Sequence, residues 1–367
     1  TNLNITSGHS LTVNGTIKLD GNYPVGTANV ALGNTALDSL TTGGNNTAIG
    51  RDVLTAATEG NHNTAVGSAA MESLTTGSFN IGLGTSALGS TTTGESNVGL
   101  GYQALVSNTT ANDNTAVGRS ALQNNTTGGS NTAVGKSALN ANTTANYNTG
   151  IGRSALKLTT TGGANVAVGN NALLSNTTGE NNTAVGYNSL DANTTGHSNT
   201  AVGCLSLSTD TTGIRNVAIG FHAGQVQNDA DDNVWVGYQC GLTNTTGTGN
   251  TGIGKDALRA NTTADLNTAV GSDALTLNTT GTQNVAVGSN ALDANTTAGY
   301  NTAVGYNAGS TITTGASNVA IGRAALQTIS TGSQNVAVGQ SALANQSGST
   351  SNNTAVGYNS LGANTTG

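Results

Sequence analysis

The chain has 367 residues, of which 7% are charged and 3% aromatic, and its formal net charge is −7. The acidic balance and the lack of any basic run argue against nucleic acid as a partner. No apolar stretch reaches the ~18 residues of a membrane span. Two cysteines, Cys204 and Cys240, are too few for a disulfide framework, and their separation by about two repeats predicts free thiols.

Residues 1–28 differ from the rest of the chain. The segments LNIT, LTVNG and TIKLDG are typical of short alternating strands with Gly turns. We expect these residues to form an N-terminal cap or connector, since a stack of repeats needs its first open edge covered. Pro24, the single proline, stands where this segment meets the repeats.

From residue 29 onward the chain repeats a unit of 17 residues, well represented by NTAVGYNSLDANTTGHS at 182–198. Asn begins nineteen units at an unbroken spacing from Asn29 to Asn335, and a twentieth begins at Asn353, so one residue is inserted within 335–352. A short fixed period indicates that each unit is one coil of a stack. The sequence predicts an all-β fold, a parallel β-solenoid (β-roll) of about twenty coils over 29–367. At strand spacing it would be roughly 95 Å long.

We number the repeat positions from the Asn. Position 4 is always Val, Ile or Leu, position 2 is mostly Thr or Val, and position 3 is Ala or Gly except at Trp235. Positions 2 and 4 share one face of a strand, and position 3 points to the other. We expect position 4 to face the core and position 3 to lie close to another layer or chain. Position 5, always Gly, predicts a sharp turn.

Other repeat positions supply a second side of the core and the turns. Positions 8 and 9 are usually Ala-Leu and predict a second aliphatic ladder, while Thr-Thr-Gly at positions 13–15 predicts a turn. The Asn at position 1 predicts a ladder of amides along the stack. One coil buries few large side chains against the entropy of ordering 17 residues. We therefore expect several chains to associate along the Ala/Gly face.

The strand NTAVG or NVAIG followed by a Gly-bounded turn resembles the head repeats of trimeric autotransporter adhesins, which are left-handed parallel β-rolls. The whole unit NTAVGYNSLDANTTG is still more similar to 17-residue arrays of phage tail fibres and related virion fibre proteins. The resemblance covers about 29–367. It implies a left-handed, parallel homotrimer used for attachment, located in a virion or at a cell surface. The C-terminal chaperone domain that often follows such arrays is not in this sequence.

Position 6 follows the turn Gly and is expected on the outer edge. It holds most of the basic residues and many aromatic ones, which could stack on sugars, hold an anionic glycan or contact another subunit. They could equally be large side chains tolerated at a solvated turn. The candidate contact residues for a surface receptor or glycan are Tyr102, Tyr187, Phe221, Tyr238, Tyr306, Arg119, Lys136 and Arg153. Position 17 adds the aromatic residues Phe79, Tyr147 and Tyr300.

Residues 204–242 depart most from the repeat. Position 9 loses its Leu at Gly224 and Gly241, and Trp235 stands at the small position, where it could fill a gap, mark a joint or belong to a site. The acidic run at 228–232 offers oxygen ligands for Ca²⁺. It lacks the calcium-loop pattern, however, and an acidic turn is commonly just solvated.

Nothing in the pattern favours catalysis. The four histidines are scattered over positions and coils, and no nucleophile, base and acid share a register. Asp256 and Asp273 share position 7 in adjacent coils, so a carboxylate pair is conceivable, but nothing beside them suggests a substrate platform. We predict no enzyme activity, no cofactor and no metal.

The sequence therefore predicts a non-catalytic fibre shaft that mediates attachment through a cell-surface glycan or protein receptor. An alternative is a self-assembling extracellular filament built by end-to-end association of this chain. An ice-binding protein, suggested by Thr at position 13 in 17 of 20 coils, and a glycan-degrading enzyme are weaker alternatives.

Overall fold

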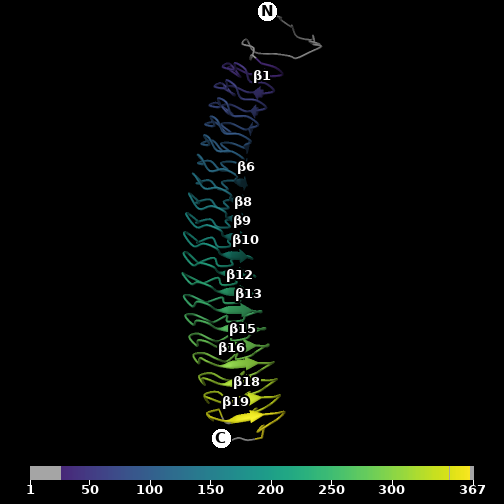
Figure 1. Ribbon diagram of the computed structural model, residues 1–367, viewed down its shortest axis with the longest axis vertical. Helices are drawn as coiled ribbons and strands as arrows, with labels where there is room; N and C mark the ends of the chain where they lie inside the picture. The colour runs from purple at the N-terminus through teal and green to yellow at the C-terminus, as the bar shows by residue number, and fades with distance from the viewer. Residues whose placement is uncertain (1–25, 347, 364–367) are drawn as a thin grey trace, which may run out of the picture. The chain divides into compact units, whose positions relative to one another are not determined.

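A computed structural model describes residues 26–346 and 348–363. The predicted cap at 1–28 lies outside the described residues except for 26–28. The described residues contain twenty strands of three residues each and no helix. The predicted parallel β-solenoid is confirmed, with about one strand for each 17-residue coil (Figure 1).

The chain divides into two compact units, one up to Thr127 and one from Gly128. The first contains β1 (Val30–Leu32), β2 (Thr47–Ile49), β3 (Thr64–Val66), β4 (Ile81–Leu83), β5 (Val98–Leu100) and β6 (Thr115–Val117). The second contains β7 (Thr132–Val134), β8 (Thr149–Ile151), β9 (Val166–Val168), β10 (Thr183–Val185), β11 (Thr200–Val202), β12 (Val217–Ile219), β13 (Val234–Val236), β14 (Thr251–Ile253), β15 (Thr268–Val270), β16 (Val285–Val287), β17 (Thr302–Val304), β18 (Val319–Ile321), β19 (Val336–Val338) and β20 (Thr354–Val356).

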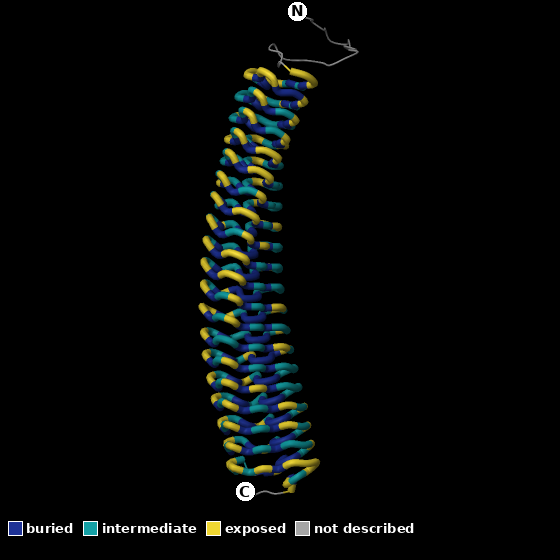
Figure 2. The backbone as a smooth tube through the Cα atoms, viewed as in Figure 1, coloured by how far each residue is buried: buried dark blue, intermediate teal, exposed yellow. Residues whose placement is uncertain are grey.

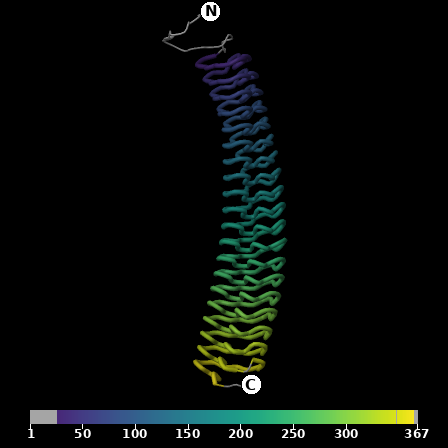
Figure 3. Tube along the Cα trace, turned by 180° about the vertical axis from the view of Figure 1, so that it is seen from behind, coloured from purple at the N-terminus to yellow at the C-terminus, as the bar shows by residue number. Residues whose placement is uncertain are grey.

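Within each unit every strand pairs in parallel with the strand of the next coil, at a shift of one repeat. Thr183 of β10 is opposite Thr200 of β11, for example, and Ala184 is opposite Ala201. Viewed from behind, the coils of each unit follow one another in chain order (Figure 3). Val336 of β19 is opposite Thr354 of β20, so the pairing keeps its register across the one-residue insertion.

The face of each strand that is buried is opposite to the one expected from the sequence. In every strand the middle residue, at position 3, is buried, and its two neighbours at positions 2 and 4 are partly or largely exposed (Figure 2). Ala184 is fully buried, while Ile219 and Ile253 at position 4 are each 41% exposed. The Ala/Gly face therefore lines the chain's own core, and the β-branched face is the outer one.

Small residues face inward because the coil is narrow and its interior is already filled from the opposite side. Leu at position 9 projects toward the strand of the following coil: a Cβ added to Gly150 would lie 3.4 Å from Cγ of Leu139. Ala at position 8 completes this wall, and residues at both positions are buried in nearly every coil. The predicted second aliphatic ladder is confirmed, and it leaves room for only a methyl group at position 3.

The turn after each strand needs the Gly at position 5. Gly186 has φ of +140°, a conformation that residues with a side chain rarely adopt. A Cβ there would also lie 2.4 Å from the carbonyl oxygen of Gly203 in the next coil. The predicted sharp turn is confirmed, and its close stacking excludes any other residue.

The Asn ladder at position 1 is buried and ties three parts of neighbouring coils together. Asn182 accepts a hydrogen bond from the backbone N–H of Asn199 at Oδ1 (3.0 Å), and its Nδ2 donates to the carbonyl of Gly196 (2.8 Å). A second buried amide ladder runs at position 12, where Asn193 Nδ2 donates to Asn176 Oδ1 (2.9 Å). Buried amides of this kind must be paired, so the ladders specify the stacking register.

Candidate functional site

The largest local departure from the repeat lies in the coils around Trp235, in the second unit. The Trp235 indole is fully buried and occupies the space that Leu takes at position 9 of other coils. A Cβ at Gly224 would lie 2.6 Å from Trp235 Cδ1, and one at Gly241 would lie 2.3 Å from Cδ2. Of the roles considered from the sequence, filling a gap is the one that the packing supports.

A chain of polar side chains extends from this tryptophan through the core. Trp235 Nε1 donates to Gln227 Oε1 (2.9 Å), and Gln227 Nε2 donates to Asp210 Oδ2 (3.2 Å). Gln227 and Asp210 stand at position 12, where Asn forms the ladder in most coils. Sequence reasoning missed both, although their departure from Asn was a visible signal.

Asp210 is a buried carboxyl group with an altered acidity. Burial raises the pKa of Asp210 to about 6, and hydrogen bonds from Gly213 N–H and Gln227 only partly offset this. On the other side of Asp210, Asn193 Oδ1 is buried without a hydrogen-bond partner. A protonated Asp210 would supply the donor that an Asn supplies in regular coils, so the core favours the neutral acid.

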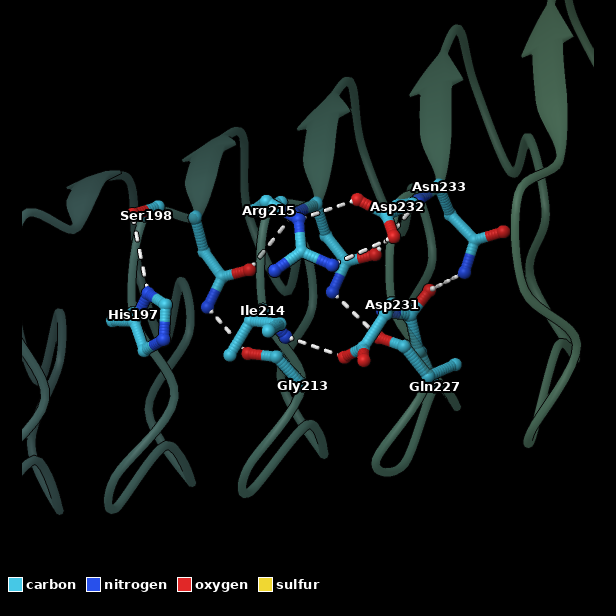
Figure 4. Close-up of polar contacts among 12 residues, drawn as sticks. His197, Ser198, Gly213, Ile214, Arg215, Gln227, Asp231, Asp232 and Asn233 are labelled. Atoms are coloured by element: carbon cyan, nitrogen blue, oxygen red, sulfur yellow. Dashed lines mark hydrogen bonds and ion pairs between the residues drawn. The ribbon is translucent and has the colours of Figure 1, made fainter.

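The acidic run at 228–232 is used to tie one coil to the preceding one (Figure 4). Asp231 Oδ1 accepts from Ile214 N–H (2.9 Å), and Asp232 receives two bonds from the Arg215 guanidinium (2.6 and 2.8 Å). The Thr211 and Thr212 hydroxyls donate to Asp229 and hold its pKa below the usual range. Each of the three carboxylates thus has a protein partner, and in the described part of the chain no group of three or more His, Cys, Asp or Glu is placed to hold a metal.

The aromatic and basic residues at position 6 lie on the surface, as expected. Tyr102, Tyr187, Phe221, Tyr238 and Tyr306 are each about half exposed, and Arg119, Lys136 and Arg153 are exposed. In the first unit the Arg119 guanidinium lies 5.9 Å from the ring centre of Tyr102. In the second, the Phe221 ring stacks on Tyr238 (5.6 Å) and on His222 (3.8 Å). Contact with a receptor or glycan stays a prediction for all eight residues.

Asp256 and Asp273, the carboxylate pair considered for hydrolysis, form ion pairs with neighbouring basic residues. Lys255 Nζ lies 2.9 Å from Asp256 and 4.0 Å from Asp273, and Arg259 also faces Asp256. The neighbouring carboxylates raise the pKa of Lys255. The described histidines take part in surface stacking or short polar contacts: His62 stacks on Phe79, and His197 lies 3.2 Å from the Ser198 hydroxyl.

Three further sequence features are clarified by burial. Cys240 is buried, which raises its pKa to about 12, and Cys204 is partly exposed; both thiols are free. The hydroxyl groups of Thr at position 13 commonly donate to a carbonyl of the next coil, as Thr177 does to Thr194 (3.0 Å). Those hydroxyls are thereby engaged within the stack, which weakens the argument for ice binding through this position.

A shallow hollow of about 210 Å³ lies in the second unit at positions 14–17 of three successive coils. Tyr147 stands at one end and Glu180 at the other, with Gly163 and Ala164 between them. The sequence indicated Tyr147 as an exposed aromatic residue, but the hollow itself depends on how three coils stack.

No protein-family model matches the chain, and no curated protein matches it. Within the described residues, no helix is long and apolar enough to cross a membrane. The fold and the surface chemistry are therefore what bear on function.

Proposed function

We propose that this protein is a non-catalytic, adhesive fibre shaft whose copies associate side by side through the outer face of the strands. The observation that carries the proposal is the pair of β-branched columns at positions 2 and 4. Among their members in the second unit, Ile151, Ile219, Ile253 and Ile321 are each about 40% exposed. All-parallel sheets are rarely left with one apolar face open to water.

A second copy of the same chain is the partner that fits this face. Its side chains repeat at the spacing of stacked coils, about 4.8 Å, and another copy presents β-branched columns of the same period. The sequence analysis expected chains to associate along the Ala/Gly face. Because that face is buried in the core of each chain, we place the contact between chains on the outer strand face. The number of chains, three, comes from the resemblance to fibre and adhesin repeats, as does a location on a virion or cell surface.

In this proposal the coils hold exposed side chains at regular intervals away from an attachment point. Repeated weak contacts from position 6 and its neighbours then bind a surface by avidity. The ion pairing of Asp256 and Asp273 and the coil-tying role of the acidic run support a structural role for these residues over a chemical one.

Light scattering of the full chain, with electron microscopy of the same sample, tests the proposal. We expect a discrete particle of three chains. A single chain in solution would refute association through the strand face, and open-ended polymers would favour the self-assembling filament.

A further inference from the structure

The hollow between Tyr147 and Glu180 combines an exposed ring with unused polar groups. Tyr147 is 71% exposed, the highest value among the tyrosines that the structure describes except Tyr358 in the last coil. Gly163 and Ala164 in the following coil form the floor beside the ring. The hollow extends over two coil spacings, roughly 10 Å, which is room for one or two sugar rings.

A hydrogen bond that ties other coils together is missing at this place. In several coils the backbone N–H at position 16 donates to a short polar side chain of the next coil: Gly129 to Asn146 (2.7 Å), Ile214 to Asp231 (2.9 Å) and Thr248 to Asp265 (2.7 Å). In the coil after Gly163, position 16 is occupied by Glu180, whose side chain is longer than that of Asn or Asp. Neither the Gly163 N–H nor the Glu180 carboxylate has a hydrogen bond among the described residues.

The hollow therefore offers donors and acceptors of complementary kinds. Gly163 supplies a backbone N–H, and Asn146, whose Oδ1 is used by Gly129, retains its amide nitrogen as a donor. Glu180 supplies a carboxylate acceptor, which forms stronger hydrogen bonds than a neutral group does. Thr144 and Thr161 add hydroxyl groups at the rim.

We propose that this hollow binds an uncharged sugar residue of a surface glycan, with one face of the sugar ring stacked on Tyr147 and its hydroxyl groups bonded to Glu180 and Gly163. Aromatic rings favour flat, weakly polar C–H faces, and a carboxylate and an amide N–H together match neighbouring hydroxyl groups. The proposal deepens the adhesive role proposed above and depends on it for its biological meaning.

The charge of the hollow selects against acidic ligands. No Lys or Arg lines it, and Glu180 would repel a uronic acid, a sialic acid or a nucleotide phosphate. This distinguishes the hollow from the basic residues of position 6, for which an anionic glycan was considered.

Tyr300 provides a matched internal control. It also occupies position 17, it is 62% exposed, and Gly299 precedes it. The following coils carry Ala316 and Ser333 at position 16, and Ala316 N–H donates to Ser333 Oγ (3.0 Å), so the carboxylate wall is missing. Tyr300→Ala removes an equivalent ring without altering the hollow.

The test uses the full chain on a printed array of neutral, N-acetylated, sulfated and sialylated glycans, followed by saturation-transfer NMR with the bound neutral glycan. We expect neutral glycans to bind. Tyr147→Ala should weaken binding at least about tenfold and Glu180→Gln about threefold to thirtyfold, while Tyr300→Ala should leave binding unchanged. Circular dichroism of each variant checks that the coils are intact.

Binding of acidic glycans alone, binding of no neutral glycan, or equal binding by Tyr147→Ala and the wild type would each overturn the proposal. The mass of the same sample separates this result from the shaft function. Associated chains that bind no neutral glycan would refute the hollow only, and single chains that bind one would refute the shaft only.

Discussion

The indole nitrogen of Trp235 donates a hydrogen bond to Gln227 Oε1 at 2.9 Å, inside the core of the solenoid. This bond joins two departures from the repeat, a Trp in place of Ala and a Gln in place of Asn, eight residues apart. The space for the ring comes from two further departures, Gly224 and Gly241. The irregular coils are therefore a coordinated repacking that keeps the strand pairing of β13 with β12 and β14 intact.

Trp235→Ala should lower the free energy of unfolding by about 3–5 kcal/mol, because it empties the space beside the two glycines. Adding Gly224→Leu and Gly241→Leu to this variant restores the regular pattern and should recover most of the loss. Gly224→Leu alone should destabilise, since its Cβ would collide with the indole. Chemical denaturation followed by circular dichroism measures all four proteins, and a triple variant no more stable than Trp235→Ala would contradict the repacking.

Asp210→Asn should stabilise the protein at neutral pH and flatten its pH dependence. The folded chain holds a proton on Asp210, with a pKa of about 6, that the unfolded chain releases near its ordinary value of 3.8. The contribution of Asp210 to the free energy of unfolding therefore falls as the pH rises from about 4 to about 6, by about 3 kcal/mol. The replacement amide can also donate to Asn193 Oδ1.

The measurement for Asp210 is the difference in unfolding free energy between wild type and variant across this pH range. Asp232→Asn serves as a control that should stay flat over this range: Arg215 holds the pKa of Asp232 below its ordinary value of 3.8, so that stabilisation is lost only as the pH falls below about 4. A constant difference between wild type and Asp210→Asn from pH 4 to pH 7 would show that Asp210 is ionised in the fold.

Asn182→Ala should destabilise the second unit strongly for a change of one small side chain. It leaves the Asn199 N–H buried without a partner, at about 1–3 kcal/mol, and it removes one of the two hydrogen bonds to the Gly196 carbonyl, which keeps the bond from Asn193 Nδ2 (3.1 Å). Amide hydrogen exchange should quicken first at Asn199. Thr178→Ala, at an exposed turn residue two positions after Asn176, is the matched control. It should change neither the free energy of unfolding nor the amide exchange rate at Asn199.

Ile219→Lys combined with Ile253→Lys should convert the associated particle into single chains, because it places two charges on the proposed contact face. Leu277→Lys introduces the same charge at a residue that is 53% exposed but belongs to position 11. We expect that variant to keep the mass of the wild type in light scattering. If both variants associate equally well, the outer strand face is not the contact between chains.

Several features of the fold could be predicted from residue periodicity alone. The regular return of Asn and Gly establishes the coil length, the strand at positions 2–4 and the turn at position 5, and each agrees with the structure. The missing Leu at Gly224 and Gly241 even indicated the gap that Trp235 fills. These features depend on residues close together in the chain or on residues repeated at one position. When identical coils stack, the residues at one repeat position form a column, so each feature follows from the repeat itself.

The direction of the strand faces could not be obtained in the same way. Alternation separates Ala184 from Thr183 and Val185 but does not say which side is the interior, and apolarity favoured the wrong one. Only the stacked coil shows that Leu139 and its equivalents at position 9, many of them at positive φ, already fill the narrow space opposite the strand. The hollow beside Tyr147 likewise requires three coils in place.

By itself, the sequence determined that this chain is a stack of parallel 17-residue coils. A unit of 17 residues is too short to bury its apolar side chains alone, so identical units bury them by stacking on one another. The tertiary structure decided what each coil buries and what it shows to water. The coil interior is too narrow for both a Leu and a β-branched strand residue, so the β-branched columns lie outside, where another copy can cover them.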